Sequence, residues 1–199
     1  MRAFVFLLAA TAASAVNAET LIGRIEDPGL RRKTAVVYVE AAAGKFAAPA
    51  QPAVMNQIRN TYAPHLLAVL AGQKVEFRSG DPELHNVNGR HSKQQLFNQA
   101  VLPHQVFSKV MEKAGIVHLS CNVHKEMSAD IVVLQNPYFA QPDANGQFSI
   151  AGLPPGKYTL RIFGDQLSDE QRARLSLHGR PGAHQPGHEV IRCRKSLPS

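Results

Sequence analysis

Four side chains in this sequence are of the types that bind copper, and three of them lie close together in the chain. A thiolate, an imidazole and a thioether come from Cys121, His124 and Met127, within the segment Cys-Asn-Val-His-Lys-Glu-Met. A second imidazole, His85, lies 36 residues before Cys121. Two histidines, one cysteine and a weak axial methionine are the ligand set of a blue-copper electron-transfer site. The residue types therefore predict one type 1 copper site that cycles between Cu(I) and Cu(II).

Strands must position these ligands. The segment 115–120, directly before Cys121, is typical of a strand, and so is the segment 131–134 that follows the loop. On the first strand Val117, Leu119 and Cys121 share one face, which we expect to point into a core and shield the thiolate. A short loop would then bring the histidine and the methionine toward the same point.

The ligand pattern resembles the cupredoxin family. His85 and Asn86, followed by a Cys-x2-His-x2-Met loop ahead of a closing strand, carry the resemblance, and the loop spacing is most similar to that of the amicyanins. The resemblance covers residues 54–135 and implies a cupredoxin-like Greek-key β-sandwich. It implies that all four candidate side chains bind the copper, and that Asn86 ties the two ligand segments together from outside the ligand set.

A second resemblance covers residues 138–163. The Asp-x-x-Gly turn at 143–146, the alternating strand after it and the Pro-Pro-Gly-x-Tyr turn at 154–158 resemble the carboxypeptidase regulatory-like module. That module is a small transthyretin-like β-sandwich, and its presence implies no peptidase activity. The segment lacks the two early strands of the module.

The missing strands have candidates near the start of the chain, at 21–25 and 35–39. We therefore predict that the copper domain, residues 54–135, is inserted into a β-module built from residues 20–45 and 138–163. The Ala-, Gly- and Pro-rich segment 41–52 would form the boundary, since insertions succeed at exposed, poorly packed sites. The alternative is that residues 21–40 are the first strands of the copper sandwich itself.

The predicted fold class is all-β, because short strands recur with turn signals between them. Beyond those already named, we expect strands at 54–58, 66–70, 74–77 and 106–110, with a tight turn at Gly72. Residues 164–199 differ in character: a short helix is predicted at 168–177 from its capping pattern, and a polar, disordered tail follows.

Residues 1–18 have the features of a secretory signal peptide, with Arg2 before an apolar run too short to span a bilayer. The sequence thus predicts an exported, periplasmic protein with a cleaved signal peptide and no membrane span. The net charge of +7 is spread along the chain without a basic–aromatic motif, so nucleic-acid binding is not expected. We expect a redox protein as the partner.

Two cysteines, Cys121 and Cys193, leave a disulfide open as an alternative to the metal site, because the expected compartment is oxidising. The absence of a Gly-x-Ser-x-Gly motif and of a carboxylate pair argues against a hydrolase, and no enzyme activity is predicted. Two functions remain: a carrier of single electrons, or a copper-binding or structural β-protein without an electron-transfer role.

Overall fold

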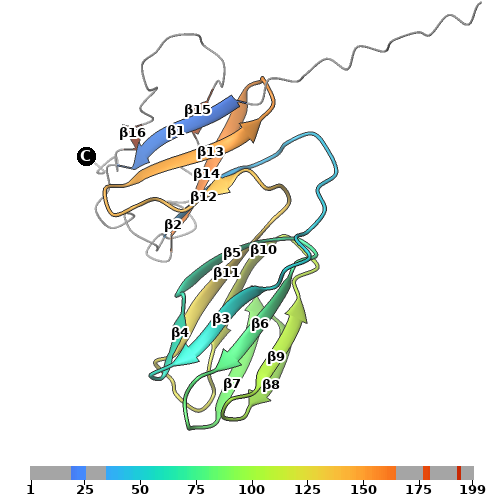
Figure 1. Cartoon of the computed structure of the whole chain (residues 1–199), viewed down its shortest axis with the longest axis vertical. Helices are drawn as coiled ribbons and strands as arrows, with labels where there is room; N and C mark the ends of the chain where they lie inside the picture. The colour runs from blue at the N-terminus through green and yellow to red at the C-terminus, as the bar shows by residue number, and fades with distance from the viewer. Residues whose placement is uncertain (1–18, 26–34, 165–176, 180–191, 194–199) are drawn as a thin grey trace, which may run out of the picture.

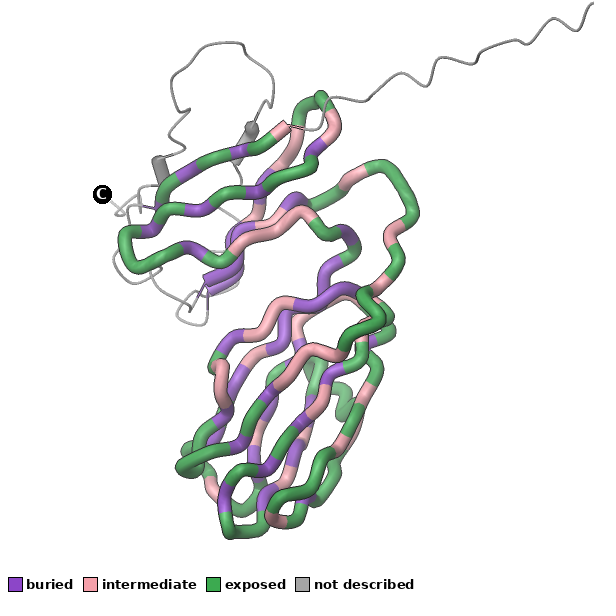
Figure 2. Tube along the Cα trace, viewed as in Figure 1, coloured by how far each residue is buried: buried purple, intermediate pink, exposed green. Residues whose placement is uncertain are grey.

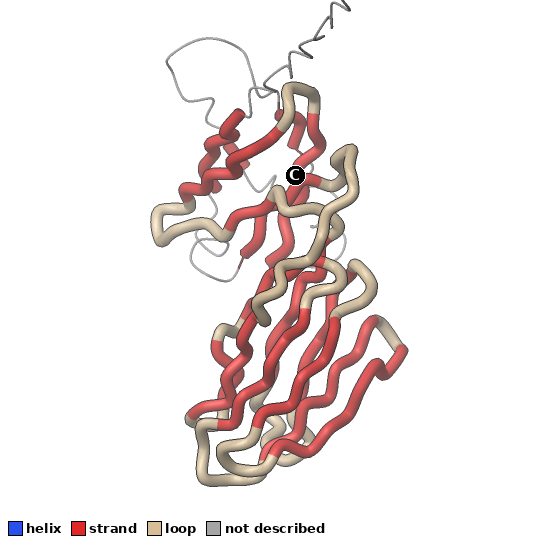
Figure 3. Tube along the Cα trace, turned by 45° about the vertical axis from the view of Figure 1, so that its right-hand side comes forward, coloured by secondary structure: helices blue, strands red, loops and turns tan. Residues whose placement is uncertain are grey.

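The computed structural model describes residues 19–25, 35–164, 177–179 and 192–193, and all regular structure in these ranges is β-strand (Figure 3). Within these ranges no helix has the length and apolarity needed to cross a membrane. The predicted signal peptide lies outside the described residues, and so does the predicted helix at 168–177 apart from its last residue.

Residues 53–134 form the part of the chain that carries the candidate ligands, which we call the site module. Its strands are β3 (Ala53–Ile58), β4 (Thr61–Ala63), β5 (Leu66–Leu70), β6 (Lys74–Ser79), β7 (His85–His91), β8 (Gln94–Val101), β9 (Val106–Val110), β10 (Gly115–Ser120) and β11 (Ser128–Leu134). They form a four-stranded sheet in the order β4-β3-β6-β9 and a five-stranded sheet in the order β5-β11-β10-β7-β8. The β3–β6 and β5–β11 pairs are parallel and the others antiparallel.

Buried and exposed positions alternate along strands of the site module (Figure 2). Because side chains at alternate strand positions lie on opposite faces of a sheet, the core of the site module lies between its two sheets. Its buried members are Met55, Tyr62, Val69, Val75, Phe77, Val87, Val101, Met111, Val117, Leu119, Cys121, Met127, Ala129, Ile131 and Val133. Burying one large apolar side chain stabilises the fold by about 1.5–3 kcal/mol. As the sequence predicts, Val117, Leu119 and Cys121 share the buried face.

Strand direction places the candidate ligands at one end of the site module. The chain enters at the start of β3, and β3 and β6 run parallel toward the far end (Figure 1). The loops at 80–84 and 121–127 follow strands that run in that direction, so they meet at the end opposite to the chain connections at 40–52 and 135–138.

The remaining strands form a second pair of sheets, which we call the flanking module. They are β1 (Glu19–Ile25), β2 (Ala35–Val39), β12 (Phe139–Ala140), β13 (Gln147–Leu153), β14 (Tyr158–Gly164), β15 (Leu177–Gly179) and β16 (Arg192–Cys193). One sheet has the order β13-β1-β16 and the other β12-β2-β14-β15. Two short strands correct the predictions for the end of the chain. β15 begins at Leu177, which was predicted to end a helix, and pairs with β14, and β16 lies in the tail predicted to be disordered and pairs with β1.

The strand pairing that the insertion hypothesis requires is present. β2 pairs with β14 from Ala35–Gly164 to Val39–Leu160, and β1 pairs with β13. Neither β1 nor β2 pairs with a strand of the site module. The alternative, in which residues 21–40 begin the copper sandwich, would require a strand pair with the site module, and β1 and β2 form none in the part of the chain that the structure describes.

A small apolar cluster joins the two modules. Val36 of β2 and Phe163 of β14 pack against side chains on the outer face of β5 and β11, which are Leu66, Leu70, Val132 and Leu134. All six are buried, with Phe163 at 2% exposure. The flanking module thus covers an apolar face of the site module at the end away from the candidate ligands.

Candidate metal centre

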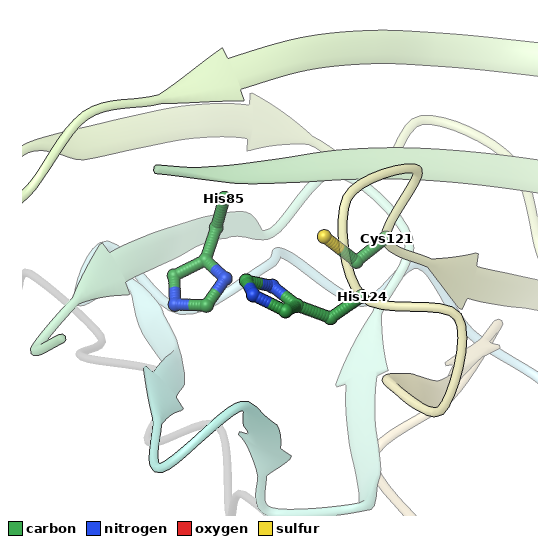
Figure 4. Close-up of side chains that lie close together, drawn as sticks. All are labelled: His85, Cys121 and His124. Atoms are coloured by element: carbon green, nitrogen blue, oxygen red, sulfur yellow. The ribbon is translucent and has the colours of Figure 1, made fainter. Parts of the chain in front are cut away.

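Three of the four candidate ligands converge at the far end of the site module. His85 is the first residue of β7, Cys121 directly follows β10, and His124 lies in the loop between β10 and β11. One ligand atom from each lies within 4.8 Å of the other two, and Figure 4 shows the sulfur and the two rings turned toward one another. In the part of the chain that the structure describes, this is the one group of three His, Cys, Asp or Glu side chains so placed.

The two imidazoles face the site with the same nitrogen. Their ring centroids are 5.0 Å apart. Nδ1 of each ring is buried and has no hydrogen-bond partner among the described residues. Nε2 of His85 lies 2.9 Å from Asp81 Oδ2, and Nε2 of His124 lies 3.2 Å from Glu83 Oε2. A carboxylate beside Nε2 favours the imidazole tautomer that carries its proton on Nε2. The lone pair on Nδ1 of each ring is then free to bind a metal.

Asp81 is held firmly where it meets His85. It is 7% exposed, and its carboxylate also accepts hydrogen bonds from the backbone N–H groups of Arg59 (2.6 Å) and Asn60 (3.0 Å). Burial alone would raise the pKa of the Asp81 carboxyl, but the hydrogen bonds from Asn60, Arg59 and His85 together hold that pKa below its usual value. Asp81 is thus an ionised acceptor at neutral pH.

Cys121 is a free thiol that is 4% exposed, so a disulfide to Cys193 is not formed. The loop after it is closed by backbone hydrogen bonds: Cys121 N donates to Met127 O (3.2 Å), and Met127 N donates to His124 O (3.1 Å). Met127 is 1% exposed and belongs to the same core cluster as Cys121. The loop therefore brings the methionine back to the buried side of the site.

Asn86 links the two segments that carry the candidate ligands, the position that the resemblance implies. Its Oδ1 accepts a hydrogen bond from Asn122 N (3.4 Å), and its Nδ2 donates to Asn98 Oδ1 (2.7 Å). Its backbone oxygen accepts a hydrogen bond from the Tyr62 hydroxyl at 2.8 Å. The residue after His85 is thus tied to the residue after Cys121 and to the neighbouring strands.

Three residues of this site, Tyr62, Asp81 and Glu83, were not singled out from the sequence. The signal for Asp81 was available, because a histidine that binds a metal usually has a carboxylate or carbonyl on its other nitrogen, and Asp81 lies four residues before His85. No local signal marks Tyr62, since its partners are 24 and 58 residues away.

The donor set fits copper. A buried free thiol and two buried imidazole nitrogens without partners are ligands of the softness that a copper ion in either oxidation state accepts, and the core keeps bulk water away from the sulfur. An orphaned buried nitrogen is unfavourable unless something binds it, which is a further reason to expect a metal between the rings.

Comparison with family models and with curated proteins gives no match. Among solved structures, the chain is similar to a purple cupredoxin from Nitrosopumilus maritimus (20% identity, 41% of this chain and 99% of that one, TM-score 0.38). It is also similar to amicyanin from Paracoccus versutus (18%, 49% and 97%, TM-score 0.40). A third similar structure is a copper-containing nitrite reductase from Thermus scotoductus, of which it covers 25% (18% identity, 49% of this chain, TM-score 0.41).

Proposed function

We propose that this protein is a periplasmic carrier of single electrons with one type 1 (blue) copper site. The ligands would be Nδ1 of His85 and His124, the Cys121 thiolate and, as a weak axial ligand, Met127. The observation that carries the proposal is the convergence of a buried thiol and two buried, unpartnered Nδ1 atoms within 4.8 Å. Such a His2Cys set with an axial methionine is that of blue-copper proteins.

The bound copper would supply a reversible one-electron change, and the protein's part is to keep the ligands in place during it. His85 is fixed by Asp81, which is itself held by two backbone N–H groups. Cys121 is held at the end of β10 and by the closed loop. Because these side chains are positioned without a metal, little rearrangement is needed when the charge of the centre changes.

Of the two candidate histidine ligands, His124 lies nearer to solvent. Its side chain is 22% exposed, whereas that of His85 is 0% exposed. We propose that electrons enter and leave through this ring, to and from a redox protein. The flanking module lies at the other end of the site module, so it leaves this exit open.

The flanking module is proposed to be a carboxypeptidase regulatory-like β-module into which residues 54–135 are inserted. Its pairing of β2 with β14 and of β1 with β13, on either side of the insertion, supports this proposal. Its role would be structural or adhesive. No enzyme activity is proposed for either module.

The test is the visible spectrum of the mature protein after addition of one equivalent of Cu(II). We expect the intense blue colour of a copper–thiolate bond. Cys121→Ser should abolish the colour, and Cys193→Ser, the matched control, should keep it. A wild-type protein that binds one copper and stays colourless would refute the blue-copper assignment. It would favour the alternative of a copper-binding or structural protein without electron transfer.

A further inference from the structure

Tyr62 lies at the point where the strands that carry His85 and Cys121 stop pairing. The β10–β7 ladder runs from His118–Arg90 to Ser120–Asn88 and ends there. His85 and Cys121 both lie beyond that end, so the ladder does not fix the distance between the two ligand segments.

The hydroxyl of Tyr62 connects the two ligand segments beyond the end of this ladder. The Tyr62 oxygen lies 2.8 Å from the backbone oxygen of Asn86 and 3.2 Å from that of Ser120. Asn86 directly follows His85, and Ser120 directly precedes Cys121. Since a phenol has one proton, it is shared between the two carbonyl oxygens. Tyr62 is 3% exposed, so water is not at hand to take over this hydrogen bond.

The other links across the gap are weaker. Asn122 N to Asn86 Oδ1 and Asn88 Nδ2 to Asn122 Oδ1 are both 3.4 Å long and exposed. Long, exposed hydrogen bonds contribute less to fixing a geometry than a short buried one. The Tyr62 hydroxyl is therefore the shortest of these links between the two ligand segments, and it belongs to a buried side chain whose hydrogen bonds are less exposed than the others.

Tyr62 is itself fixed to the His85 side of the site. It belongs to β4, which pairs with β3 through the Gln57–Tyr62 and neighbouring positions. The turn between these strands has Arg59 and Asn60 in the left-handed region, with φ values of 53° and 54°. Non-glycine residues adopt this conformation at a cost. Asp81, the partner of His85, accepts a hydrogen bond from both of their N–H groups and so holds the turn.

We propose that Tyr62 is a positioning residue for the metal centre: its hydroxyl sets the spacing between the His85 and Cys121 segments. The inference rests on the proposed copper site for its spectroscopic consequence, but the spacing exists without metal. Loss of the hydroxyl leaves an isosteric ring in the core, so the fold remains and the two segments become free to separate.

The test compares Tyr62→Phe with Tyr158→Phe. Tyr158 is a matched control, because its hydroxyl also donates to a backbone oxygen, Pro154 O at 2.7 Å, but in the flanking module. In the metal-free protein, we expect hydrogen exchange of the Cys121 and Met127 amides to become about five-fold faster in Tyr62→Phe and to stay unchanged in Tyr158→Phe. In the copper form, Tyr62→Phe should shift the thiolate band and the reduction potential, and Tyr158→Phe should shift neither.

The two proposals fail in different ways. If wild-type protein is colourless with Cu(II), the copper assignment fails, and the amide-exchange comparison still decides the role of Tyr62. If Tyr62→Phe has wild-type exchange at Cys121 and Met127, Tyr62 is not a positioning residue. The same conclusion holds if Tyr62→Phe only lowers the melting temperature while the band and the potential stay those of the wild type.

Discussion

Asp81 and His85 are joined by a contact of 2.9 Å between a carboxylate oxygen and Nε2, and this contact determines which nitrogen of His85 faces the site. With the proton on Nε2, Nδ1 carries a lone pair, and Nδ1 is the buried atom without a partner. The metal-free protein therefore already presents His85 in the form in which it can bind a metal. A bound metal would satisfy the orphaned nitrogen rather than reorganise the side chain.

Asp81→Asn tests this relationship. An amide in place of the carboxylate keeps the shape but has only one oxygen. The NH2 group replaces either Oδ1, which accepts from Arg59 N, or Oδ2, which accepts from Asn60 N and faces His85 Nε2, so the bonds to that position are lost. We expect the free energy of unfolding of the metal-free protein to fall by about 1–3 kcal/mol at pH 7, measured by urea denaturation. The affinity for copper should fall by about ten- to a hundred-fold.

A control for Asp81→Asn is Asp143→Asn, which changes a carboxylate in the flanking module that accepts hydrogen bonds from Asn145 N and Gln147 N. Both of these bonds go to Oδ1, which the amide oxygen can replace, so this control should change the stability and the copper affinity little. Equal copper affinity in Asp81→Asn and the wild type would show that Asp81 does not position His85.

Met127→Leu separates the two roles of this side chain, as a core residue and as a ligand. Leucine has a similar volume, so the metal-free protein should lose less than about 1.5 kcal/mol of stability. A weak axial ligand tunes the copper more than it holds it, so copper should remain bound and blue while the reduction potential changes. Voltammetry of both proteins makes the comparison. An unchanged potential would mean that Met127, which is 1% exposed, is a core residue only.

The strands around the ligand loop are predictable from the sequence because they are short, apolar and alternating. The predicted strands at 106–110 and 115–120 have the bounds of β9 and β10, and Gly72 adopts the positive φ of 87° expected at a tight turn. Tertiary structure adds little there that the local pattern does not already show. The ligand types and their spacing are local as well, within one loop and one strand start.

The parts that the sequence did not reveal depend on contacts between distant residues. β7 and β8 are rich in Asn, Gln and Gly, and β8 is mostly exposed, so neither has the pattern of a strand. They are held by their pairing and by Phe97, whose ring lies where a Cβ at Gly89 would be, directly across the two strands. Tyr62 was missed for the same reason, since its two hydrogen-bond partners are 24 and 58 residues away in the chain.

Phe163→Ala tests how firmly the two modules are joined. Phe163 is 2% exposed in the junction cluster, so its removal leaves a cavity against β5 and β11. We expect a loss of about 3–5 kcal/mol in the free energy of unfolding. Ile22→Ala in β1, at a side chain that is 43% exposed, should change it by less than about 0.5 kcal/mol. If the two variants are equally stable in urea denaturation, the junction cluster contributes nothing to the stability of the protein.

We predict that the effect of Tyr158→Phe on the free energy of unfolding depends on pH. The pKa of the Tyr158 phenol is raised, first by burial and then by the charges of Tyr138 and Glu19. A folded-state pKa above the unfolded value, about 10 for tyrosine, means that the folded protein keeps its proton where the unfolded chain has lost it. The contribution to stability is therefore complete below pH 10 and disappears as the pH rises through the folded-state pKa.

We expect Tyr158→Phe to be about 0.5–1.5 kcal/mol less stable than the wild type at pH 8, because the hydrogen bond to Pro154 O is lost. Above pH 10 the wild type should lose stability more steeply than the variant, and the two curves of unfolding free energy against pH should approach each other. The pKa of Tyr62 is also raised by burial and by the nearby Cys121, so both proteins keep a common alkaline decline. Curves that remain parallel from pH 8 to pH 11 would contradict the assignment of the raised pKa to Tyr158.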